Sequence, residues 1–220
     1  MAYFRCTGEG GGGGTSPSIT FTPKTFFDES GIGSSGWVAT DGVTNMSYFG
    51  NFTGTPGEKV VSNSTNNLMM YFPITGSYFL FGIHCKINPN FTPKNSNDWY
   101  SCSCVLGQEL SGTQKDCAVI IDKNGYFALG TSTATIDSTS VYALDGNDHT
   151  IFMLVEADKI SLYIDGALEK SVNIVMGGGE MNNMGVLFNG DAYTRTDGEV
   201  YSVGYWEESI PQLPIQLPTI

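Results

Sequence analysis

Apolar side chains recur at every second position between residues 78 and 87, and this alternation constrains the fold more than any other feature of the 220-residue chain. One side of the segment is apolar throughout, with Phe79, Phe81, Ile83, Cys85 and Ile87. A period of two is the period of a β-strand that packs one face against a core. The opposite side is mixed, with Tyr78, Leu80, His84 and Lys86. We therefore expect a long strand whose second face is only partly covered.

Two hairpins and several shorter strands are expected elsewhere. Apolar runs at 117–122 and 126–129 flank Asn124-Gly125, a pair that favours a type I′ turn with positive φ at both residues. A second turn is expected at Asp165-Gly166, between runs at 159–164 and 167–172. Further strand-like runs occur at 19–22, 46–52, 68–72 and 200–206, and no segment shows sustained helical periodicity. The sequence therefore predicts an all-β domain.

Composition excludes several classes of partner. The formal net charge is −12 and the isoelectric point is near 4.3, so the chain repels nucleic acid and anionic membrane surfaces. No apolar run approaches the roughly 18 residues of a membrane-spanning helix. The first residues run into glycine rather than into an apolar core, so no cleavable signal peptide is visible.

Three segments are expected along the chain. Residues 1–16 form a Gly-rich arm, with an apolar head at Tyr3-Phe4 and an unbroken glycine run from Gly10 to Gly14. No lysine follows this run, so it is not a phosphate-binding loop. Residues 17–210 form the folded domain, and residues 211–220 form a Pro-rich tail that is either a strap on the domain or a connector.

The cysteines and several carboxylates are candidate metal ligands. Five cysteines cannot all pair within one chain, and we expect buried thiols. Zinc on Cys102 and Cys104 with Cys85 or Cys117 is the alternative, although the usual C-x₂-C spacing is missing. No cofactor is expected. Calcium is left open, because oxygen ligands gather in Asp145, Asn147 and Asp148 and in Asp191 with Asp197. The Asp122-x-Asn124-Gly125 turn imitates part of a calcium loop, but the glutamate of such a loop is absent and the hairpin accounts for the pattern.

The segment from Asp145 to Gly166 resembles the laminin G-like branch of the concanavalin A-like lectin/glucanase superfamily. The matching positions are Asp145, Gly146, His149, Leu162, Tyr163, Asp165 and Gly166. Asp148 stands where that family usually has tryptophan. The segments 76–86 and 198–206 resemble the family's central and closing strands, so the likeness spans about residues 45–210. The resemblance implies an antiparallel jelly-roll sandwich of two stacked sheets, and it transfers almost no site.

Catalytic patterns are incomplete. Glycosidases of this superfamily carry Glu-x-Asp-x-x-Glu on one strand, and the pair Glu156 and Asp158 lacks the third acid. Glu207 and Glu208 are adjacent and would point to opposite faces of a strand. The chain has two histidines, and His149 reads as a packed, hydrogen-bonded residue. We expect no enzyme.

Two loops have the chemistry of sugar binding, in which aromatic faces meet apolar sugar faces while amides and carboxylates bind hydroxyl groups. The candidate ligand-binding residues are Asn97, Asp98 and Trp99 in the first loop and Asn189, Asp191, Tyr193 and Arg195 in the second. The structural alternative is a pair of ordinary polar loops, with Trp99 beginning a core strand.

These observations favour a non-catalytic binding or structural protein. Its apolar head and glycine arm resemble the openings of phage and prophage proteins, so we expect a tail or fibre component with a lectin-like, carbohydrate-binding domain. The arm would bind other virion or surface proteins, and the domain would bind a cell-surface glycan. The oligomeric state is left open, with a homo-oligomer as one alternative. The expected location is the virion or extracellular surface. A free carbohydrate-binding module and a glycoside hydrolase are the alternatives.

Overall fold

The computed structural model describes side chains in residues 79–94, 102–107, 117–131, 136–156, 158–173 and 196–204, with those of Lys59 and Val61, and the backbone of the remaining strands. The expected arm at 1–16 and tail at 211–220 lie outside the described residues. All regular elements in the described part are strands, and no helix there is long and apolar enough to cross a membrane. The strands are β1 (Phe27–Asp28), β2 (Val38–Ala39), β3 (Ser47–Phe49), β4 (Thr53–Thr55), β5 (Lys59–Ser62), β6 (Leu68–Pro73), β7 (Phe79–Ile87), β8 (Ser103–Gln108), β9 (Cys117–Ile121), β10 (Tyr126–Thr131), β11 (Asp137–Tyr142), β12 (Asp148–Val155), β13 (Lys159–Ile164), β14 (Ala167–Asn173), β15 (Asn183–Phe188) and β16 (Gly198–Glu207).

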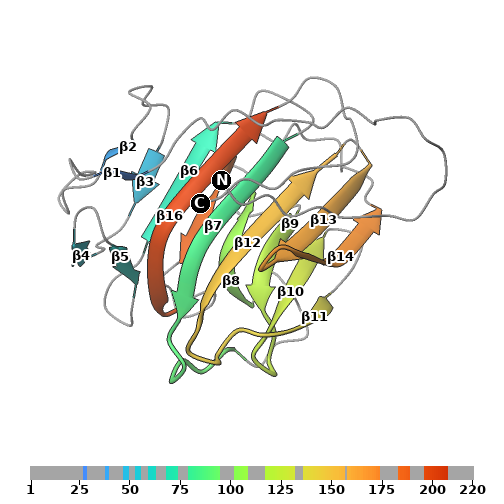
Figure 1. Ribbon diagram of the computed structural model, residues 1–220, viewed down its shortest axis with the longest axis horizontal. Helices are drawn as coiled ribbons and strands as arrows, with labels where there is room; N and C mark the ends of the chain where they lie inside the picture. The colour runs from blue at the N-terminus through green and yellow to red at the C-terminus, as the bar shows by residue number, and fades with distance from the viewer. Residues whose placement is uncertain are drawn as a thin grey trace.

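Fourteen of these strands form two stacked, seven-stranded antiparallel sheets (Figure 1). The β7 sheet has the order β14-β13-β12-β7-β16-β5-β4, and the β9 sheet has the order β11-β10-β9-β8-β15-β6-β3. Strands β1 and β2 pair separately. From β5 to β8 the chain passes from one sheet to the other at every strand. The expected all-β, antiparallel jelly-roll sandwich is confirmed.

The main core lies between the two sheets and is built from alternate residues. On β7, the five apolar residues at 79, 81, 83, 85 and 87 are all buried in this core, as the alternation predicts. They face Cys117, Val119 and Ile121 of β9 and Phe127 and Leu129 of β10. Each large side chain of this kind stabilises the fold by about 1.5–3 kcal/mol on burial. The hydrophobic effect therefore accounts for the stacking of the sheets.

The outer face of the β7 sheet is divided along the strands. At one end Leu80, Phe152, Leu154 and Tyr163 are buried although they point away from the main core. At the other end His84 and Lys86 are partly exposed. The expectation of a partly covered second face is therefore correct, and the covered part coincides with the apolar half.

The two hairpin turns differ in type. Asp165 and Gly166 have φ values of 51° and 84°, so they form the type I′ turn that a two-residue hairpin favours. Gly125 has a φ of 87°, but Asn124 has a negative φ, so the type I′ prediction at Asn124-Gly125 is wrong. Asp122 accepts hydrogen bonds from the N–H groups of Asn124 (2.8 Å) and Tyr126 (3.0 Å). This carboxylate holds a longer loop, in which glycine takes the left-handed position that closes it.

Polar side chains join the two sheets at one side of the sandwich, where β11 and β14 are the edge strands. The backbone N–H and the hydroxyl of Ser140 both donate to Glu169, and the Nζ of Lys170 lies 2.8 Å from the Oδ1 of Asp137. Charged and hydroxyl groups therefore line this edge.

Candidate functional site

The seven candidate ligand-binding residues, Asn97, Asp98, Trp99, Asn189, Asp191, Tyr193 and Arg195, lie outside the described residues, and they stay predictions. The strand ends that flank both loops are described. The first loop runs into β8 and the second follows β15, and these strands are antiparallel neighbours. Thr196, just beyond the second loop, donates its hydroxyl to the backbone oxygen of Cys104 at the start of β8 (2.6 Å). Both predicted loops are therefore attached at the same end of the β9 sheet.

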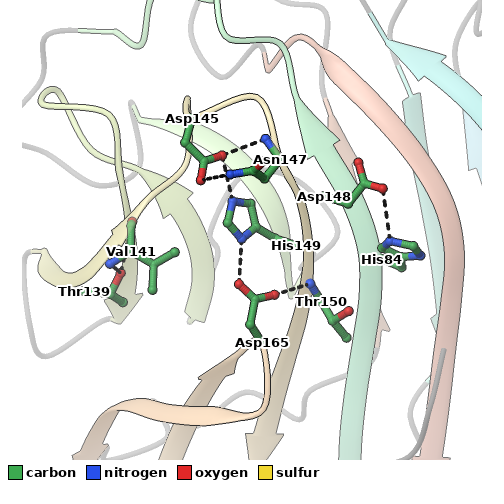
Figure 2. A network of polar contacts seen from close by, with 9 residues as sticks. All are labelled: His84, Thr139, Val141, Asp145, Asn147, Asp148, His149, Thr150 and Asp165. Carbon is green, nitrogen blue, oxygen red and sulfur yellow. Dashed lines mark hydrogen bonds and ion pairs between the residues drawn. The ribbon is translucent and has the colours of Figure 1, made fainter.

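The described residues contain a histidine held between two carboxylates, which Figure 2 shows from close by. The Nδ1 of His149 lies 2.8 Å from the Oδ2 of Asp165, and its Nε2 lies 3.2 Å from the Oδ1 of Asp145. Asp165 belongs to the β13–β14 turn, and its Oδ1 also accepts the N–H of Thr150 (2.9 Å). Asn147 donates its backbone N–H and its side-chain amide to Asp145. The histidine thus ties two loops to the start of β12.

Burial and charge act in opposite directions on this histidine. The side chain of His149 is only 5% exposed, and its ring meets the ring of Phe127 edge-on at a centroid distance of 5.2 Å. Burial alone would lower its pKa, but hydrogen bonds and charge from Asp165 and then Asp145 outweigh burial and raise the pKa above its ordinary value. Burial would raise the pKa values of the two carboxyl groups, but hydrogen bonds, from Asn147 to Asp145 and from His149 to Asp165, lower both.

This arrangement cross-links two loops through one histidine. Both ring nitrogens of His149 are occupied, and the ring is enclosed between the sheets. His149 is therefore packed and hydrogen-bonded, as predicted. Three of the positions that carry the laminin G-like resemblance, Asp145, His149 and Asp165, therefore meet here.

The candidate metal ligands do not converge among the described residues. Asp145 directs its carboxylate to Asn147 and His149, whereas Asp148 lies on the outer face of β12 beside His84. Asp122 is engaged by its own hairpin and by the Ser138 hydroxyl (2.6 Å). In the part of the chain that the structure describes, no group of three His, Cys, Asp or Glu side chains could hold a metal ion. Asp197 is described and buried, and its predicted calcium partner Asp191 is not described.

Four cysteines are buried thiols, as expected. Cys85 and Cys117 belong to the main core, whereas Cys102 and Cys104 belong to a second apolar cluster with Ala118, Ile120 and Ala128. Cys117 and Ala118 are successive residues of β9, so the two clusters lie on opposite faces of that sheet. Burial, followed by the charges of Asp165 and Asp148, raises the pKa of the Cys85 thiol well above its usual range. The proposed zinc set is therefore divided between two faces.

A second polar cluster crosses the exposed half of the outer face of the β7 sheet, and we call it the His84 row. It consists of Asp148 on β12, His84 on β7, Tyr201 and Glu199 on β16, and Lys59 on β5. The Nζ of Lys59 lies 2.8 Å from Glu199, and the Tyr201 hydroxyl donates to the same carboxylate (2.8 Å). The rings of Tyr201 and His84 are 4.9 Å apart, and the Nε2 of His84 lies 3.9 Å from Asp148. Neighbouring contacts therefore connect four adjacent strands.

The charges within the row stabilise one another. Burial would raise the pKa of Glu199, but hydrogen bonds from Lys59 and Tyr201 and the charges of Lys59 and Lys86 lower it. Burial and the nearby carboxylates of Glu199 and Asp148 raise the pKa of Tyr201 far above its usual range. Tyr201 thus stays a neutral phenol, and Glu199 stays ionised, at neutral pH. The alternation at 78–87 predicts that His84 and Lys86 face outward, but it does not predict the row.

Comparison with known proteins gives the fold. No protein-family model matches the chain, and no curated protein sequence matches it. Among solved structures, Trypanosoma rangeli sialidase in complex with sialic acid has a TM-score of 0.67 at 17% identity, covering 85% of this chain and 31% of the sialidase. The chain thus spans about a third of that protein. The exoplasmic/lumenal domain of VIP36 has TM-scores of 0.57 in its metal-free form and 0.53 in its Ca²⁺-bound form, at 9% and 10% identity. These matches cover 87% and 84% of this chain and 95% and 90% of the VIP36 domain. This chain therefore has a lectin-like β-sandwich fold.

Proposed function

We propose that this protein is a non-catalytic, carbohydrate-binding sandwich of the laminin G-like type that serves as a tail or fibre component of a phage or prophage virion. The observation that carries the binding proposal is the position of the strands that flank the two predicted loops. Their flanking strands, β8 and β15, are neighbours, and Thr196 fastens the end of the second loop to the start of β8. Trp99 and Tyr193 would then contribute to one site at that end of the sandwich.

The likeness to solved structures supports the same class of ligand. The sialidase structure was determined with sialic acid, and the VIP36 domain was determined with and without Ca²⁺. About a third of the sialidase and most of the VIP36 domain share this fold, and we take this likeness as support for a carbohydrate ligand. Fold likeness alone does not transfer a ligand, and the sugar chemistry of the two loops carries the proposal further.

The proposal that the protein is not an enzyme rests on how its described acids are used. Most glycosidases need two carboxyl groups that face the scissile bond, whereas sialidases use a tyrosine as the nucleophile. Asp145 and Asp165 are bonded to His149, Glu199 is bonded to Lys59 and Tyr201, and Asp122 closes a hairpin. A glycoside hydrolase is the competing function, favoured by the sialidase likeness, and release of fluorophore from 4-methylumbelliferyl sialoside by the full chain would overturn the non-catalytic proposal.

The binding test uses the full chain on an array of bacterial polysaccharides and oligosaccharides, followed by calorimetry with the strongest ligand. Trp99→Ala and Tyr193→Ala are each expected to weaken binding about tenfold or more, because each removes an aromatic face. Tyr142→Ala is the matched control, since Tyr142 is an exposed aromatic (42%) on β11, three strands from β8 in the β9 sheet. Absence of binding to every glycan would overturn the proposal.

The virion proposal assigns the first 16 residues to assembly and the sandwich to the bacterial surface. The location would then be the virion or extracellular surface. Deleting residues 1–16 should leave the thermal unfolding of the domain unchanged and abolish its incorporation into particles. Unchanged incorporation would refute the role of the arm, and glycan binding without any particle would favour a free carbohydrate-binding module.

A further inference from the structure

The outer face of the β7 sheet changes character halfway along its strands. Its apolar half is buried at Leu80, Phe152 and Leu154, whereas the half that carries the His84 row is open to solvent. The side chains of His84 and Asp148 are 31% and 52% exposed. The open region is therefore a bounded patch rather than a uniformly polar surface.

The residues of the patch hold one another in place and still offer bonding capacity. Lys59, Glu199 and Tyr201 are fixed by two contacts of 2.8 Å. The 3.9 Å separation between the Nε2 of His84 and the Oδ2 of Asp148 is too long for a hydrogen bond, and the Asp148 side chain is half-exposed, so His84 and the exposed side of Asp148 can still bind another molecule. The patch thus combines two adjacent rings with groups that donate and groups that accept hydrogen bonds.

The charge of the patch indicates which class of ligand it can bind. Among the described residues of this region, Lys59 and Lys86 balance Glu199 and Asp148, so these residues carry no formal net charge when His84 is counted as neutral. The chain as a whole carries a formal charge of −12, which repels acidic polymers. Rings beside paired donors and acceptors, without excess charge, match a ligand that has apolar faces edged by neutral hydroxyl groups.

We propose that the His84 row is a second carbohydrate-binding site, distinct from the two predicted loops, and that it takes an uncharged oligosaccharide. The choice of a saccharide rests on the proposed function, whereas the place and the lack of charge come from the row itself. The row crosses β12, β7, β16 and β5, and three strand spacings of about 4.8 Å give a length of about 14 Å. The site is therefore long enough for more than one sugar unit.

The experiment measures calorimetric binding of uncharged gluco-, manno- and galacto-oligosaccharides, with sialyllactose as the acidic counterpart. Two protein backgrounds are compared, the wild-type full chain and the Trp99→Ala/Tyr193→Ala double variant, which lacks the aromatic residues of the loops. In the double variant an uncharged oligosaccharide should still bind, and sialyllactose should bind less tightly. Three row variants, His84→Ala, Tyr201→Phe and Asp148→Asn, are then added to the double variant.

Each row variant is expected to weaken the remaining binding about tenfold, because each removes a ring, a hydroxyl group or a charged acceptor that would contact the sugar. Tyr142→Phe and Asp158→Asn are matched controls, since both residues are exposed and lie away from the row, and they should change binding less than about twofold. Thermal unfolding of every variant checks the fold. If His84→Ala unfolds the domain, Asp148→Asn tests whether the row binds the sugar, because a half-exposed carboxylate can be replaced without loss of packing.

The outcomes separate the two proposals. If the wild type binds and the double variant does not bind at all, the second site is overturned and the proposed function stands. The same conclusion follows if binding by the double variant survives all three row substitutions. Failure of the wild type to bind any glycan would overturn the proposed function and the second site with it. Tighter binding of sialyllactose than of uncharged sugars to the double variant would refute the charge argument.

Discussion

Replacing His149 with alanine is expected to lower the free energy of unfolding by about 3–4 kcal/mol. The two hydrogen bonds to Asp165 and Asp145 involve charged groups, but these carboxylates are 50% and 33% exposed and can be rehydrated. We therefore assign about 1–2 kcal/mol to both bonds together. Loss of a buried ring packed edge-on against Phe127 adds about 2 kcal/mol.

A second variant separates the two contributions. His149→Phe keeps a ring beside Phe127 and loses both hydrogen bonds, so it should cost only about 1–2 kcal/mol. His84→Ala is the control for removing a histidine, and it should cost less than about 0.5 kcal/mol because its nearest carboxylate is 3.9 Å away. Urea unfolding, followed by the fluorescence of the three tryptophans, measures all three variants. Equal losses for the alanine and phenylalanine variants would refute the packing contribution, and no loss in either would refute the cross-link.

The pH dependence of stability follows from the same contacts. The pKa of His149 is raised from 6.5 in the folded chain, so its contribution is complete below about pH 6.5 and is lost as pH rises through the folded pKa. The pKa values of Asp145 and Asp165 are lowered from 3.8, so their contribution is lost only as pH falls below that value. The stability difference between wild type and His149→Phe should therefore be larger at about pH 5 than at about pH 9. A difference that grows with pH would contradict this sign.

Three further predictions concern packing. Gly107→Ala should destabilise the domain by about 1–3 kcal/mol in urea unfolding, because an added Cβ would lie 2.8 Å from the Cβ of Ala118 and 2.9 Å from the backbone oxygen of Cys117. No change in stability would mean that β8 and β9 move apart easily. Ser202→Ala should leave the melting temperature unchanged or raise it, since the hydroxyl of Ser202 is buried and has no hydrogen-bond partner in the described part of the chain; a large decrease would show that a partner exists. Native protein should expose at most one thiol to Ellman's reagent and all five after unfolding, because Cys85, Cys102, Cys104 and Cys117 are buried. Rapid reaction of several thiols in the native protein would contradict this burial.

The sequence predicts features that depend on neighbouring residues. The alternation in 79–87 identifies the buried face because every second residue of a strand shares that face. Asp165-Gly166 forms its predicted turn because both residues tolerate positive φ. The prediction at Asn124-Gly125 has the correct place but the wrong turn type, because Asp122 captures two backbone N–H groups and stabilises a longer loop. The turn propensity of Asn124-Gly125 takes no account of the Asp122 carboxylate, which lies outside that pair.

Features that depend on register could not be predicted. His149 reaches Asp165 because Ile151 pairs with Ile164, and the sequence carries no direct signal for that pairing. The His84 row also requires β16 to lie beside β7, with an irregularity between Val200 and Ser202 that shifts the register of their pairing. These strands are more than a hundred residues apart in the chain. Their chemistry was visible in the sequence, but their proximity was not.

The ion pair and hydrogen bonds between β11 and β14 also bear on how copies of this chain can meet. An edge strand has unpaired backbone groups that a strand from another molecule can extend, and charged side chains oppose such extension. Glu169 and Lys170 lie on β14 itself, and each is already engaged with β11. Strand-to-strand growth into fibrils or continuous sheets is thus disfavoured at this border, and many copies can be crowded side by side without fusing there.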